Sequence, residues 1–143
     1  MKNKKAVAAV SWCLVAACMA VIFFLSAQTA DESQELSETV ALFLRLGLSV
    51  DFIRKCAHFL EFMGLAVLVY NALYWSFGRF RPVLTFVITA AYAASDEFHQ
   101  LFVDGRACQI TDFLTDSFGA LLGIAAAWII GLLCLKIKRR RFG

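Results

Sequence analysis

Hydrophobic residues along this chain gather into four blocks that are separated by short polar stretches. The first block, residues 6–27, has no charged side chain and is long enough, as a helix, to cross a hydrocarbon core of about 30 Å. Three further blocks cover residues 57–77, 82–102 and 112–135, and the third is long enough only when its acidic end is included. The pattern predicts an all-α fold, an integral membrane bundle of four transmembrane helices that forms a single domain over residues 1–143.

The segment between the first two blocks has a helical pattern of its own. Its start, Asp31 followed by Gln34, resembles a helix-start signal, and its apolar residues recur on one side of a helix. These apolar residues are Leu36, Val40, Phe43, Leu44 and Leu48. We therefore predict a short amphipathic extracytoplasmic helix that lies on the membrane surface or across the bundle, either as a structural cover or as a gate.

Composition and charge fix the predicted class and orientation. Hydrophobic residues make up 61% of the chain, above the share typical of soluble domains. Of the 14 lysines and arginines, all but Arg45, Arg54, Lys55 and Arg106 lie at the two termini or between the second and third blocks. Because such residues favour cytoplasmic loops, we predict a multi-pass protein with both termini cytoplasmic. The net charge of +3 then reflects topology, and it does not support a nucleic-acid partner.

This topology brings three polar clusters to the outer ends of three helices. Polar residues at membrane depth usually face protein or water and serve a purpose, so their coincidence predicts an outward-facing polar site. The clusters are Lys55, His58 and Glu61; Asp96, Glu97 and Gln100; and Arg106, Asp112 and Asp116. Below the third cluster, Gly119 and Gly123 form a Gly-x-x-x-Gly pair that predicts close helix packing.

The predicted site combines several carboxylates with two permanently charged cations. Lys55 and Arg106 are expected to hold an anionic group such as phosphate, and Glu97 with His58 as its partner is expected to do acid–base work. The predicted catalytic residues are Glu97, His58 and Asp96, and the predicted ligand-binding residues are Lys55, Glu61, Gln100, Arg106, Asp112 and Asp116. A purely structural role, with charges that only set topology, is the alternative.

Two further questions stay open at this level. The five cysteines have no zinc spacing, but Cys56 and Cys108 are both expected at the outer face, where a disulfide is chemically allowed. An oxygen-rich site would favour a divalent cation such as Mg²⁺, Mn²⁺ or Ca²⁺, and we commit to no metal.

The stretches "RKCAHFLEF", "SDEFHQLFVDGR" and "TDFLTDSFGALLG" together resemble the VanZ-like family of small bacterial membrane proteins. Three residues depart from the family pattern: Phe62, Asp104 and Asp116 stand where a hydroxylated aromatic residue, a proline and an asparagine are common. The residues that match the motif are Lys55, His58, Asp96, Glu97, Gln100, Arg106, Asp112, Gly119 and Gly123.

The founding member of that family is associated with resistance to the glycopeptide teicoplanin, so the resemblance implies a role in the bacterial cell envelope. We accordingly predict a site that binds the anionic headgroup of a membrane lipid or cell-wall precursor. If a reaction follows binding, the site also modifies that headgroup. A glycopeptide is a further expected partner. The alternatives are a lipid-binding or drug-exclusion protein without turnover and a small transporter, for which four helices would require a homo-oligomer.

Overall fold

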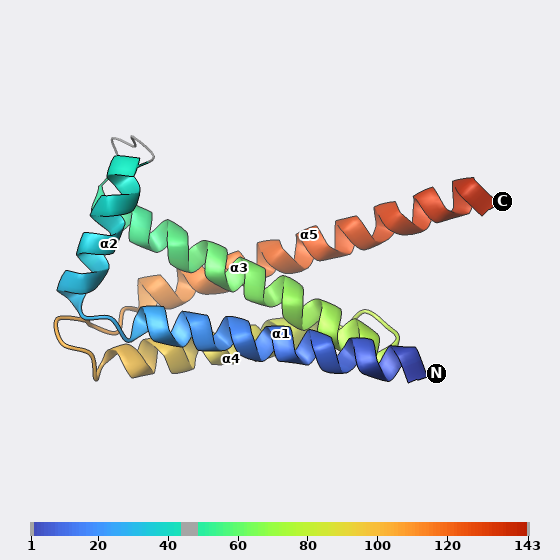
Figure 1. Cartoon of the computed structure of the whole chain (residues 1–143), viewed down its shortest axis with the longest axis horizontal. Helices are drawn as coiled ribbons and strands as arrows, with labels where there is room; N and C mark the ends of the chain where they lie inside the picture. Colours follow the sequence, from blue (N-terminus) through green and yellow to red (C-terminus); the bar gives the residue numbers. More distant parts are fainter. Residues whose placement is uncertain (1, 44–48, 143) are drawn as a thin grey trace.

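The computed structural model describes residues 2–43 and 49–142, and this part of the chain is folded into helices without a strand. The all-α class is therefore confirmed (Figure 1). The helices are α1 (Lys2–Ser26), α2 (Ala30–Phe43), α3 (Val50–Phe77), α4 (Pro82–Gln100) and α5 (Ile110–Phe142).

Local hydrogen bonds explain where two of the helices begin. At the start of α2, the Thr29 N–H donates to the Glu32 carboxylate at 3.0 Å and the Glu32 N–H donates to the Thr29 hydroxyl at 3.3 Å. This reciprocal pair is a capping box, and it places the helix start before the expected Asp31. At the start of α3, the Ser49 side chain accepts a hydrogen bond from the Phe52 N–H. Because Ser49 caps the helix there, α3 begins earlier than the expected residue 57.

Three helices are long and apolar enough to cross a membrane within the described part of the chain: Asn3–Ser26, Asp51–Phe77 and Ile110–Cys134. The prediction of four spans is thus supported for three of them. α4 does not qualify by length and composition, because its last two turns carry polar residues that include Asp96 and Glu97.

α3 is the central element of the bundle. It packs most extensively against α5 and also contacts α1, α2 and α4. Its buried side carries Phe62, Leu65, Val69 and Leu73, which recur every three or four residues, as the contact face of a helix does. A core of apolar side chains therefore runs along α3 and holds the other helices.

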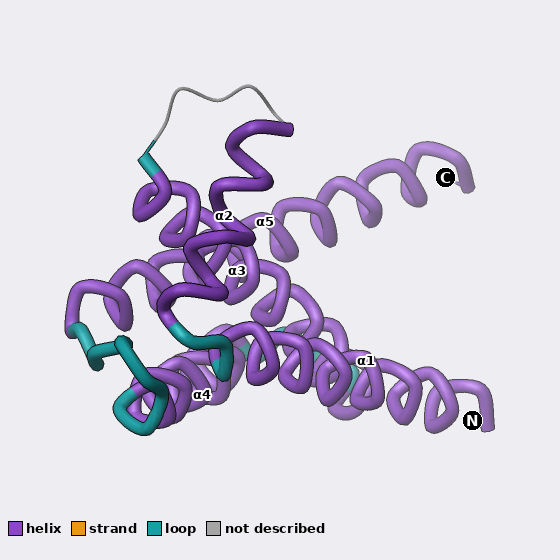
Figure 2. Tube along the Cα trace, turned by 60° about the vertical axis from the view of Figure 1, so that its left-hand side comes forward, coloured by secondary structure: helices purple, strands orange, loops and turns teal. Residues whose placement is uncertain are grey.

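The two ends of the bundle differ in what they contain. Figure 1 shows both termini and the α3–α4 loop towards one end, which we call the terminal end. The α1–α2 connection, the α4–α5 loop and the first turns of α3 and α5 lie at the opposite end, which we call the loop end (Figures 1 and 2). Both termini lie at one end, as the predicted orientation requires. That this end faces the cytoplasm stays a prediction.

α2 is present where an amphipathic helix was predicted, and its serine side, rather than its apolar side, faces the bundle. Ser33 and Ser37 are buried, whereas Leu36 and Val40 are 47% and 36% exposed. Because α2 packs against α3, its small serine side chains allow a close approach and its apolar side is left outward, where a membrane surface would cover it. The expected positions Leu44, Arg45 and Leu48, and the side chain of Phe43, lie outside the described residues.

Candidate functional site

The loop end of the bundle contains all nine predicted site residues. α3 supplies three of them from its first turns, α4 supplies three from its last two turns, and the α4–α5 loop and the first turns of α5 supply the rest. The three polar clusters are therefore brought to one end of the fold. They are joined to one another and to α1 by the contacts that follow.

Asp96 connects α4 to α1. Its Oδ2 accepts hydrogen bonds from Ser26 Oγ at 2.7 Å and from Gln100 Nε2 at 3.2 Å, and Asp96 is only 3% exposed. Its Oδ1 is buried and has no hydrogen-bond partner within the described ranges. Ser26 was not among the predicted site residues, although a small polar residue near the end of the first block, at the same leaflet as the acids, was a usable signal.

Glu97 ties the end of α4 to the loop before α5. Its Oε2 accepts a hydrogen bond from the backbone N–H of Gln109 at 2.9 Å, and the residue is 3% exposed. Because almost every residue has a backbone N–H, the sequence does not indicate which one a carboxylate will accept from. This contact was therefore not predictable from the spacing of polar residues. Half of the carboxylate is thus engaged in holding the loop.

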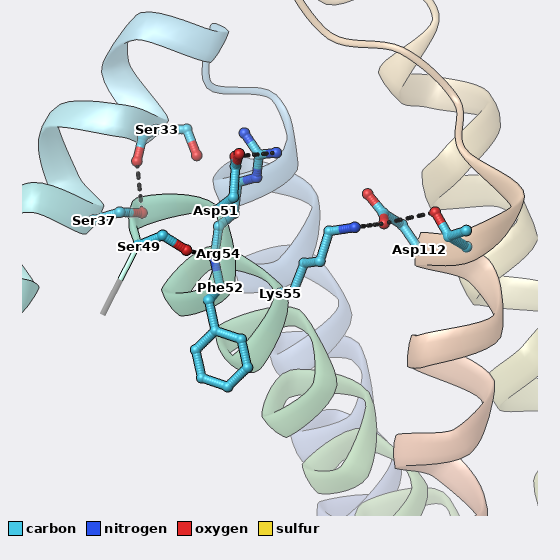
Figure 3. Close-up of polar contacts among 9 residues, drawn as sticks. Ser33, Ser37, Ser49, Asp51, Phe52, Arg54, Lys55 and Asp112 are labelled. Carbon is cyan, nitrogen blue, oxygen red and sulfur yellow. Dashed lines mark hydrogen bonds and ion pairs between the residues drawn. The ribbon is translucent and has the colours of Figure 1, made fainter. Parts of the chain in front are cut away.

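Lys55 and Asp112 join α3 to α5 at the rim of the site. Lys55 Nζ lies 3.0 Å from Asp112 Oδ1, with side chains 42% and 19% exposed. Figure 3 shows the lysine side chain reaching from α3 towards the carboxylate at the start of α5. The cation that was expected to hold an anionic ligand therefore already has one carboxylate beside it.

We expect this ion pair to contribute little to stability, because Lys55 is exposed enough for water to screen its charge. A double-mutant cycle of Lys55→Met and Asp112→Asn, read by thermal unfolding of the detergent-solubilised protein, should give a coupling free energy of about 0.2–1 kcal/mol. A coupling several times larger would show that the pair is shielded from solvent and is a main link between α3 and α5.

His58 lies beside Glu61, one turn further along the same helix. Their Nδ1 and Oε2 atoms are 3.5 Å apart, and both atoms are buried without a hydrogen-bond partner in the part of the chain that the structure describes. The expected partnership of His58 with Glu97 is not formed by any described hydrogen bond or ion pair, because Glu97 is turned towards the Gln109 backbone. The pair best placed for proton exchange is therefore His58 and Glu61.

Arg106 lies where the α4–α5 loop meets the α1–α2 connection. Its Nε donates to the Gln28 carbonyl at 3.2 Å, and no carboxylate is within ion-pair distance of it in residues 2–43 and 49–142. Burial lowers the pKa of the Arg106 guanidinium, and the nearby Arg54 lowers it further, yet an arginine stays charged in proteins. Arg106 is thus a fixed cation that no described carboxylate neutralises by direct contact.

The loop around Arg106 is held by close backbone contacts. The Ala30 N–H donates to the Asp104 carbonyl at 3.2 Å. Gly105 has φ 74°, in the left-handed region that favours glycine, and a Cβ there would lie 2.9 Å from Ala30 Cβ. These contacts fix the loop, and with it the base of the Arg106 side chain, against the start of α2.

α5 carries a buried acid and, beyond it, a pair of glycines that pack against α3. Asp116 is 1% exposed, and its Oδ1 has no hydrogen-bond partner among the described residues. One turn further on, a Cβ on Gly119 would lie 2.5 Å from the Phe59 carbonyl oxygen, and a Cβ on Gly123 would collide with the Met63 carbonyl oxygen. The two glycines therefore let α5 approach the α3 backbone, in the packing role predicted for them.

The structure also bears on the metal and disulfide questions. Among the described residues, no group of three or more His, Cys, Asp or Glu side chains is arranged to hold a metal ion. The five cysteines, including Cys56 and Cys108, are free thiols.

Comparison with known proteins gives one match. Residues 11–131 match the protein-family model described as VanZ/LLP1, a range that includes every residue of the site described above. No curated protein and no solved structure matches the chain.

Proposed function

Because this chain belongs to the VanZ/LLP1 family, we propose that it is a multi-pass protein of the bacterial cytoplasmic membrane whose loop end binds an anionic headgroup. The ligand class is a phosphate-bearing envelope lipid or cell-wall precursor, and the loop end faces outward with both termini in the cytoplasm. The observation that carries this proposal is Arg106, whose guanidinium has no described carboxylate partner.

The geometry around Arg106 suits a phosphate. Its Nε is held by the Gln28 carbonyl, which orients the side chain and leaves the terminal nitrogens for a ligand. A guanidinium presents a planar fork of donors that matches phosphate oxygens. Lys55, 42% exposed at the rim, adds a second positive charge that an incoming anion can share with Asp112.

α4 serves in this proposal as the fourth membrane span. The hydroxyls of Thr85 and Thr89 are satisfied within the helix, since they donate to the Arg81 and Thr85 carbonyls at 2.9 Å. Polar groups in a hydrocarbon core must be satisfied in this internal way. The outward side of α4 carries exposed apolar residues such as Val83 and Val87, which lipid would cover.

A second function, acid–base modification of the bound headgroup, is favoured by the His58 and Glu61 pair. Both side chains are mostly buried, and the atoms that face each other, 3.5 Å apart, have no other partner within the described ranges. A carboxylate beside an imidazole can exchange a proton with a ligand that reaches them. Glu97 and Asp96, each with one oxygen engaged by protein, complete the set of candidate acids.

The proposal is tested by the lipids that the protein retains. Purified full-length protein is incubated with a total envelope-lipid extract, and bound lipids and new products are identified by mass spectrometry. We expect wild type to retain at least one phosphate lipid species of which Arg106→Gln retains about tenfold to a hundredfold less, as the loss of a hydrogen bond to a charged group implies. Lys136→Gln is the control for the loss of one positive charge, because Lys136 is exposed near the end of α5, away from the loop end.

Equal retention of every lipid species by wild type and Arg106→Gln would overturn the binding proposal. A product that appears with wild type and disappears with Glu61→Gln or Glu97→Gln would establish an enzyme. Retention without a product would instead favour a lipid-binding or drug-exclusion protein. Teicoplanin sensitivity of cells that carry Arg106→Gln, compared with wild type, decides whether the same site supports resistance.

A further inference from the structure

A cavity of about 440 Å³ that is largely open at the surface lies at the terminal end of the bundle, away from the site described above. It is formed between the start of α1 and the end of α3. The residues that line it are Lys4, Lys5, Ala8, Trp75, Ser76 and Gly78. Its volume is within the range of cavities that hold small ligands or headgroups.

The charges around this cavity have a single sign. None of the 11 acidic residues of the chain falls in residues 1–30, 62–95 or 117–143, and all of them lie in the segments that form the loop end or lead to it. Lys4 and Lys5 therefore line a cavity whose own walls supply no counter-ion. Arg79 and Arg81, in the loop that follows α3, raise the positive charge of the same end.

The wall of the cavity is held in place by contacts between α1 and α3. Trp12 Nε1 donates to Ser76 Oγ at 3.1 Å, and Ser76 Oγ donates to the Ala72 carbonyl at 2.7 Å. Lys4 and Ala8 are four residues apart and so lie on one face of α1. The lysines are thereby presented to the end of α3 by a defined helix–helix contact.

Two tryptophans near the cavity are exposed to the extent expected of residues at a membrane interface. Trp12 and Trp75 are 37% and 36% exposed, and tryptophan favours the headgroup level of a bilayer. A lipid at this position would have its phosphate at the lysines and the start of its acyl chains at the tryptophans.

We propose that this terminal cavity binds the phosphate headgroup of an anionic phospholipid in the leaflet at the terminal end. Lys4 and Lys5 neutralise the phosphate, which carries the net negative charge of such a headgroup, and the tryptophans lie at the boundary between headgroup and acyl chains. This site is separate from the loop end, so its occupancy does not depend on Arg106.

The test measures lipid preference in the Arg106→Gln background, which removes the proposed loop-end site. Purified full-length protein in detergent is incubated with equal amounts of phosphatidylglycerol and phosphatidylcholine of the same acyl chains, and retained lipids are counted by native mass spectrometry. We expect a preference of about tenfold or more for phosphatidylglycerol, since each basic residue at an anionic lipid surface contributes about 1 kcal/mol. Adding Lys4→Gln and Lys5→Gln should remove the preference.

Two controls separate a site from general attraction. Lys4→Arg with Lys5→Arg keeps the charge and should keep the preference, and Lys136→Gln removes an exposed lysine of α5 outside the cavity and should also keep it. Because the lipids are bound in detergent, a change of membrane orientation does not affect the result. No preference in the Arg106→Gln background, an unchanged preference in the Lys4→Gln/Lys5→Gln variant, or an equal loss in Lys136→Gln would each overturn the proposal. The loop-end proposal is judged separately, from the effect of Arg106→Gln alone.

Discussion

Gly123→Ala is expected to lower the thermal stability of the bundle, whereas Gly64→Ala is expected to leave it unchanged or raise it. A Cβ at position 123 would collide with the Met63 carbonyl oxygen and lie 3.1 Å from Ala66 Cβ, whereas a Cβ at position 64 meets nothing within 4 Å. A backbone carbonyl cannot move aside as a side-chain end can, so the cost is that of an overpacked core, about 1–3 kcal/mol or more. Gly64→Ala gains helix propensity of up to about 1 kcal/mol.

The measurement is the midpoint of thermal unfolding, followed by size-exclusion chromatography of heated samples in one detergent. Gly119→Ala should behave like Gly123→Ala, because its Cβ would lie 2.5 Å from the Phe59 carbonyl oxygen. If both variants melted with wild type, α3 and α5 would not be in contact along this face. Gly64→Ala controls for the general effect of replacing a helical glycine.

Asp96→Ala is expected to destabilise the fold and Asp116→Asn is not, although both aspartates are buried. Asp96→Ala removes the acceptor of Ser26 Oγ and Gln100 Nε2 and leaves two buried donors unpaired, at a cost of about 1–3 kcal/mol each. The double variant Ser26→Ala/Asp96→Ala should recover part of this loss, because one of the orphaned donors is gone. Thermal unfolding of the single and double variants checks both statements.

Asp116→Asn is expected to leave stability unchanged or to raise it. Asp116 is 1% exposed and its Oδ1 has no partner among the described residues, so the native site stabilises an ionised carboxylate poorly. An amide of nearly the same shape cannot ionise and avoids that penalty. A destabilisation as large as that of Asp96→Ala would show that Asp116 is held by a strong interaction in the folded protein, such as a bound ligand or an ordered water.

The spacing of polar residues predicted some features of the site but not others. Helical spacing was sufficient to place Lys55, His58 and Glu61 on one face, because the geometry of an α-helix is local. The pairing of those residues was not predictable in the same way. His58 was expected to work with Glu97, but it lies beside Glu61, and Glu97 accepts a backbone N–H.

For α2 as well, the sequence predicted the element but not its packing partner. Its apolar stripe predicted a helix, and α2 is there, but the side that packs on α3 carries Ser33 and Ser37. Periodicity identifies an amphipathic helix without saying whether protein or membrane covers the apolar side. That choice depends on how closely two helices approach, which is a tertiary property.

The sequence by itself determined the all-α class, three of the four predicted apolar spans, the family, and the collection of polar residues at the loop end. These features follow from local hydrophobicity, helix periodicity and motif spacing, which need no knowledge of distant contacts. Only the tertiary structure decided that Ser26 bonds Asp96, that Lys55 pairs with Asp112, and that Lys4 and Lys5 share a cavity with Trp75. Each of these contacts joins residues far apart in the chain, and the packing of whole helices against α3 sets the distance between them.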